Sequence, residues 1–120
     1  MKPLFIHYPN CGTCKKAAKW LSEHNPDVEY RHIVENPPTR KELALWIGQS
    51  GLPLKRFFNT SGRKYRELGV KDRMQTASTD ELIDLLATDG MLVKRPILVQ
   101  GETVLVGFRE SEWADLFNSE

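Results

Sequence analysis

The chain contains two cysteines, Cys11 and Cys14, with Gly12 and Thr13 between them. They fall where a short apolar run ends and a helical pattern begins, so we expect them at a helix N-terminus. Such an end presents unpaired backbone N–H groups and partial positive charge. Both features stabilise a thiolate, which is the reactive form of cysteine. The position of the pair therefore predicts thiol redox chemistry.

Three interpretations of the cysteine pair compete. Free cysteine is often buried, so the pair could simply pack in a core. It could also supply half of a zinc site, but a closed site needs four ligands with defined spacing. The three histidines, His7, His24 and His32, are scattered and show no such pairing. A redox-active dithiol on a βαβ unit is the interpretation that the spacing favours.

The helix position implies different roles for the two thiols. Cys11 should lie just before the helix and be exposed, whereas Cys14 should lie one turn inside, on the buried face. The exposed thiolate would attack a substrate disulfide or another oxidised species. The inner thiol would then resolve the mixed intermediate as a Cys11–Cys14 disulfide. Gly12 and Thr13 keep the intervening loop small.

The elements around the pair form a βαβ pattern. Residues 3–8 read as a short strand. The following helical stripe, which Trp20 borders, runs to Asn25-Pro26, which should stop it. Residues 28–33 alternate between apolar and polar side chains and read as a second strand. Strand, helix and strand within about 30 residues predict two parallel strands with a right-handed crossover.

The middle of the chain reads as a helical insertion at about residues 34–94. Two capping boxes, one at Thr39 with Glu42 and one at Ser78 with Glu81, mark two helix starts. The pattern predicts roughly three helices and no convincing strand. Phe57 and Phe58 are expected in the core of the insertion.

The C-terminal part reads as a hairpin followed by a helix. Residues 97–99 and 103–106 are strand-like and are joined by a tight connection. Residues 110–117 form an amphipathic helix with Trp113 facing inward. The chain is thus expected to be one α/β domain, residues 1–120, with a mixed four-stranded sheet ordered as β-α-β, helical insertion and β-β-α.

Composition restricts the partners. With 17 Lys and Arg against 16 Asp and Glu, the net charge is +1, so nothing attracts nucleic acid or an acidic membrane in general. No apolar run approaches the roughly 20 residues of a membrane span. The apolar stretch Leu4 to Ile6 is too short for a secretory signal. We therefore expect a cytoplasmic protein that binds neither membranes nor nucleic acid directly.

Several segments together resemble the arsenate reductase (ArsC)/Spx family. They follow one another along nearly the whole chain, and they are Tyr8-Pro9-Asn10-Cys11-Gly12-Thr13-Cys14-Lys15-Lys16-Ala17, Asn36-Pro37-Pro38-Thr39, Phe58-Asn59-Thr60-Ser61-Gly62, Tyr65-Arg66-Glu67-Leu68-Gly69 and Lys94-Arg95-Pro96. The resemblance implies a thioredoxin-like (glutaredoxin-like) fold with a helical insertion, which agrees with the pattern above.

The resemblance also implies a set of site residues. Cys11 matches the reactive cysteine of the family, and Arg95 matches an arginine that binds the oxyanion in arsenate reductases. Arg109 lies near the position of another such arginine, and Gly12 and Thr13 complete the expected substrate and anion site. Pro96 matches the cis-proline that faces the reactive cysteine, although the residues alone favour an ordinary trans-proline at a strand start.

Two functions stay open from the resemblance. The arsenate reductases finish their reaction with a thiol reductant, here glutathione, glutaredoxin or thioredoxin, and no bound cofactor or metal is implied. The Spx branch shares the CxxC pair and uses it as a redox switch in a transcriptional regulator that binds the RNA polymerase α subunit. In this chain Asn59 replaces a third arginine of the reductases, and Pro53 replaces a contact glycine of Spx. An activated cysteine beside an arginine favours the enzyme.

Overall fold

The computed structural model describes residues 2–24 and 27–118. These residues divide into two compact units. The first combines the residues up to His32 with those from Arg95 onward, and the second is Ile33–Lys94. The predicted helix stop at Asn25-Pro26 lies outside the described residues. That the whole chain is one domain with an insertion stays a prediction.

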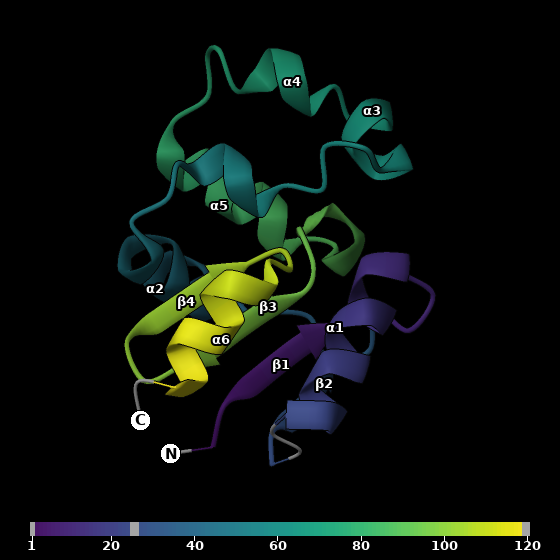
Figure 1. The fold of residues 1–120 in the computed structure, drawn as a ribbon. Helices are drawn as coiled ribbons and strands as arrows, with labels where there is room; N and C mark the ends of the chain where they lie inside the picture. The colour runs from purple at the N-terminus through teal and green to yellow at the C-terminus, as the bar shows by residue number, and fades with distance from the viewer. Residues whose placement is uncertain (1, 25–26, 119–120) are drawn as a thin grey trace. The chain divides into compact units, whose positions relative to one another are not determined.

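The first unit is built on a mixed four-stranded sheet, as predicted (Figure 1). The strand order is β2-β1-β3-β4, with β2 parallel to β1 and the other neighbours antiparallel. The first two strands are shorter than the expected ranges of residues 3–8 and 28–33. The strands are β1 Leu4–His7, β2 Glu29–His32, β3 Ile97–Gln100 and β4 Thr103–Val106.

The predicted hairpin joins β3 to β4. Gln100 pairs with Thr103, so a two-residue loop connects the strands. Gly101 has a φ of 59°. A left-handed first loop residue is what a type II′ turn needs, and glycine adopts it without steric cost.

Two helices cover apolar side chains of this sheet. They are α1 Gly12–His24 and α6 Glu110–Asn118. Trp113 of α6 and Phe5 of β1 are fully buried in one cluster, with their rings edge to face at 5.9 Å. Trp20 was expected only to border the buried stripe of α1, but it is 7% exposed and lies edge to face with Trp113 at 6.0 Å.

The second unit contains four α-helices within the described residues, where roughly three were predicted. The additional one is α4, which Gly69, with a φ of 60°, separates from α3. The helices and the two short 3₁₀ turns are α2 Arg40–Ser50, η1 Leu54–Phe57, α3 Arg63–Glu67, α4 Val70–Arg73, α5 Thr79–Ala87 and η2 Gly90–Leu92. A four-residue helix carries too little periodicity to be recognised from sequence.

Both capping boxes are confirmed. The Thr39 hydroxyl accepts from the Glu42 N–H at 3.1 Å, and the Thr39 N–H donates to the Glu42 carboxylate at 2.9 Å. The box at the start of α5 has the same reciprocal pair. Phe57 and Phe58 are buried, as predicted. No helix among the described residues has the length and apolar character to cross a bilayer.

Candidate functional site

Cys11 occupies the N-cap of α1. Its carbonyl accepts from the Lys15 N–H at 3.0 Å, which is the first turn bond of the helix. Its Sγ accepts from the Cys14 N–H at 3.4 Å. The sulfur thus stands where a serine or threonine oxygen would cap a helix, at the end that favours negative charge. The predicted position of Cys11 is confirmed.

Cys14 lies one turn further along and is 2% exposed, whereas Cys11 is half-buried. The Tyr8 N–H donates to Cys14 Sγ at 3.4 Å. Both cysteines are free thiols. The two cysteines therefore differ in the predicted direction, although Cys11 is half-buried rather than exposed.

The environment lowers the pKa of the Cys11 thiol below its ordinary value. Burial acts in the opposite direction, but it is outweighed by the Cys14 N–H, the Cys14 thiol and the Arg95 guanidinium, which donate to the sulfur. The positive charge of Arg95 adds to the effect. Donors and opposite charge both favour the thiolate over the thiol.

The environment raises the pKa of Cys14 to about 12. Burial is the largest cause, and the nearby Cys11 sulfur raises it further, while the Tyr8 N–H and the Arg95 charge act against these causes. Of the two thiols, Cys11 therefore loses its proton first, and the last proton of the pair resides on Cys14.

We expect iodoacetamide to label Cys11 at least about tenfold faster than Cys14 at pH 7, because alkylation requires the thiolate. The rate at Cys11 should rise with pH and level off below the range of an ordinary cysteine. Peptide mapping by mass spectrometry identifies the labelled residue. Equal labelling of the two residues, or an unreactive Cys11, would contradict the assignment.

Arg95 reaches the thiol pair from the segment that enters β3. The Arg95–Pro96 peptide bond is cis, as the family resemblance implied. The carbon of the Arg95 guanidinium lies 5.2 Å from the centre of the Tyr8 ring. The same guanidinium donates to Cys11 Sγ. A fixed cation beside a nucleophilic sulfur can also bind an anionic substrate.

The other predicted site residues are Gly12, Thr13 and Arg109. Gly12 and Thr13 form the exposed first turn of α1, where their N–H groups have no partner earlier in the helix. Arg109 is exposed, and its carbonyl accepts from the Trp113 N–H at 3.2 Å. It lies two residues after Gly107, whose N–H donates to the Pro96 carbonyl at 2.8 Å. An anion-binding role for these three residues stays a prediction.

No role at the thiol site was predicted for the aromatic residues beside it. His7 and His32 are partners on neighbouring strands, with ring centres 6.2 Å apart. The edge-to-face contact of His32 with Tyr8 is 5.7 Å. Burial and the nearby His32 both lower the pKa of His7. The one sequence signal for Tyr8 is that it lies three residues before Cys11.

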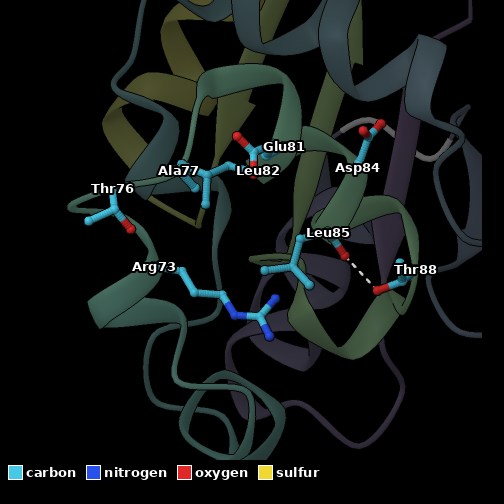
Figure 2. A pocket seen from close by; sticks show the side chains of 8 residues that line it. All are labelled: Arg73, Thr76, Ala77, Glu81, Leu82, Asp84, Leu85 and Thr88. Carbon is cyan, nitrogen blue, oxygen red and sulfur yellow. Dashed lines mark hydrogen bonds between the residues drawn. The ribbon is translucent and has the colours of Figure 1, made fainter.

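A separate cavity of about 510 Å³ lies in the second unit (Figure 2). Arg73 and Leu85 both line it, and Asp84, another lining residue, pairs with Arg40. In α5 Leu85 is half-buried, whereas Ile83 is buried. The residues that line this cavity include no cysteine or histidine, so it offers no thiol chemistry.

The described residues contain no group of three or more His, Cys, Asp or Glu side chains arranged to hold a metal ion.

The sequence matches the ArsC family over residues 6–116. The Bacillus subtilis protein YusI is 51% identical over 115 residues, which are 96% of this chain and 98% of that protein. The global transcriptional regulator Spx of Streptococcus pyogenes is 30% identical, over 93% of this chain and 81% of the regulator.

A solved structure from Streptococcus mutans, described as a possible arsenate reductase, has a TM-score of 0.86 and 43% identity. The match covers 94% of this chain and 97% of that one. The likeness agrees with the sheet order and with the thioredoxin-like fold implied by the sequence. The extent of the family match shows that this chain belongs to the ArsC family.

Proposed function

We propose that this protein is a small thiol–disulfide oxidoreductase of arsenate-reductase type. In this proposal the Cys11 thiolate attacks an oxyanion or a disulfide, and Cys14 resolves the product as a Cys11–Cys14 disulfide. The observation that carries the proposal is the contrast between the two thiols. The pKa of the accessible sulfur is lowered, and the pKa of the enclosed one is raised to about 12.

With a disulfide substrate, Cys11 Sγ forms a bond to one substrate sulfur, and the other leaves as a thiolate. Cys14 then loses its proton and attacks Cys11 Sγ, so the second substrate sulfur leaves with the bonding electron pair. The substrate gains two electrons, and the cysteine pair is oxidised by two. The Tyr8 N–H at 3.4 Å from Cys14 Sγ supports this step, because it stabilises the developing thiolate.

With arsenate, Cys11 Sγ bonds to arsenic and displaces one oxygen, which leaves as water once it is protonated. Attack by Cys14 on Cys11 Sγ breaks the sulfur–arsenic bond. Arsenic keeps the electron pair and is released as arsenite. Arg95 would bind the anion, together with Arg109 and the first turn of α1 at Gly12 and Thr13, since helix starts attract anions.

The oxidised pair must be reduced by an external thiol before a second turnover. We propose glutathione, glutaredoxin or thioredoxin for this role, by the family resemblance. These reductants keep the cytoplasm reducing, so the proposal places the protein there. It assigns no bound cofactor.

The test is turnover with arsenate and with a small disulfide as separate substrates, with each reductant in turn. We expect activity on one of them at least, and its loss in Cys11→Ser because a serine hydroxyl cannot replace the thiolate. The proposal is wrong if Cys11→Ser leaves the activity unchanged. It is also wrong if neither substrate is turned over with any of the reductants.

A redox-sensing regulator is the second candidate, and the 30% identity to Spx over 93% of the chain favours it. Here the Cys11–Cys14 disulfide would alter a surface that binds the RNA polymerase α subunit. A pull-down against the C-terminal domain of that subunit, with the pair reduced and oxidised, tests it. Absence of binding in both states rules it out.

A further inference from the structure

The main chain of Tyr8 is fixed by both cysteines. Its carbonyl accepts from the Cys11 N–H at 3.0 Å, and its N–H donates to Cys14 Sγ at 3.4 Å. The position of the Tyr8 backbone relative to the two sulfurs is thus set by hydrogen bonds that any residue at position 8 could make. The aromatic side chain is a separate feature and needs its own explanation.

The Tyr8 ring contacts two groups. The Arg95 guanidinium carbon lies 5.2 Å from the ring centre, within the roughly 6 Å reach of a cation–π interaction. The ring of His32 meets the Tyr8 ring at 5.7 Å, with an interplanar angle of 89°. The imidazole of His32 therefore restricts the orientation of the Tyr8 ring, and the same ring contacts the Arg95 guanidinium.

We propose that Tyr8 is a positioning residue of the thiol site, whose ring holds the Arg95 guanidinium where it pairs with Cys11 Sγ. The proposal deepens the proposed function and rests on it for the anion that Arg95 would bind. Tyr8 touches Arg95 rather than the reacting atoms, so it acts through the arginine.

A flexible arginine needs such a support. An arginine side chain loses rotamer entropy when it is ordered. The Cys11 thiolate can order Arg95 only while it carries its charge, and that charge disappears once the Cys11–Cys14 disulfide forms. The Tyr8 ring is present in both states. It therefore keeps the cation in place through the reaction cycle.

The test replaces residue 8 by three side chains and measures the pKa of Cys11 from the pH dependence of iodoacetamide labelling. Tyr8→Phe keeps the ring and should leave the pKa unchanged. Tyr8→Leu removes the ring and should raise it by about half a unit. Pentafluorophenylalanine at this position keeps the shape of phenylalanine but withdraws the ring electrons, so it should raise the pKa relative to Tyr8→Phe.

The same variants in an Arg95→Gln chain provide the control. There the three side chains should give equal pKa values, because the group through which Tyr8 acts is gone. The inference is overturned if phenylalanine and its fluorinated form give the same pKa with Arg95 present. It is also overturned if Tyr8→Leu raises the pKa of Cys11 by the same amount in the Arg95→Gln chain as in the chain that keeps Arg95.

The comparison of phenylalanine with pentafluorophenylalanine at position 8 tests the role of the ring even if Tyr8→Leu does not fold. The outcome is independent of turnover. A chain that reduces neither arsenate nor disulfides but shows the Tyr8 effect refutes the proposed function and leaves the role of Tyr8 intact.

Discussion

Cys14→Ser is expected to stop the reaction after its first step, with a fragment of a disulfide substrate retained on Cys11. Cys11 keeps its N-cap position and its contact with Arg95 in this variant, so its attack continues. The thiol that should release the product is missing. An external thiol can replace it only slowly, since an internal group acts at a far higher effective concentration. We expect turnover to fall by at least about 100-fold.

The measurement is intact-protein mass spectrometry after one addition of a small disulfide. Cys14→Ser should gain the mass of one substrate half, whereas the unaltered chain should lose two hydrogens to its internal disulfide. Cys14→Ala is the matched control for the serine hydroxyl and should give the same adduct, and Cys11→Ser should give none. Full turnover by both Cys14 variants would show that Cys14 is not the resolving thiol.

The cysteine site could be predicted from sequence to the extent that it depends on local geometry. Cys11 and Cys14 are separated by one helical turn, which is enough to place one sulfur at the N-cap and the other on the buried face. Arg95 is 81 residues beyond Cys14. Only the family resemblance connected it to the pair, because no local rule joins residues so distant.

The contribution of Tyr8 could not be predicted for a related reason. Its ring contacts Arg95 and His32, which lie on the segment before β3 and on β2. A tyrosine near a CxxC pair has no pattern of its own in sequence. Its role depends on which side chains the sheet brings to the same end of neighbouring strands.

The fold divides in the same way. The parallel pairing of β1 with β2, the hairpin and both capping boxes follow from alternation, turn residues and cap residues, and they were predicted. The order β2-β1-β3-β4 was not predicted. The short helix α4 was missed because four residues span little more than one turn. Trp20 was assigned to the edge of a stripe, but the aromatic side chains of α6 bury it.

Gly90 shows what sequence patterns omit about packing. In the sequence it belongs to an Asp89-Gly90 pair that merely ends a helix. In the structure it begins the 3₁₀ turn η2, where the Asp89 carboxylate accepts from the Met91 N–H at 2.8 Å. Gly90 is buried, and its α-carbon faces the main chain of Ile33.

Gly90→Ala is therefore expected to destabilise the protein strongly. The added Cβ would overlap the Ile33 carbonyl oxygen and lie 2.9 Å from the Ile33 carbonyl carbon. Both atoms belong to the backbone, so no side-chain rotation relieves the overlap. We expect the free energy of unfolding to fall by about 3 kcal/mol, the upper part of the range for overpacking. Gly48→Ala is the matched control, because Gly48 is exposed in the last turn of α2 and a Cβ there meets nothing within 4 Å.

Gly48→Ala should stabilise the protein by about 0.5–1 kcal/mol, since alanine is the better helix former. Urea unfolding of both variants, followed by tryptophan fluorescence and by far-ultraviolet circular dichroism, gives the two free energies. A single transition seen by both probes would also support the prediction of a single domain, because tryptophans report on both units: Trp46 lies in the unit of Gly90 and Trp113 in the other. A loss below about 1 kcal/mol for Gly90→Ala would show that the Ile33 backbone yields, contrary to the close packing on which the prediction depends.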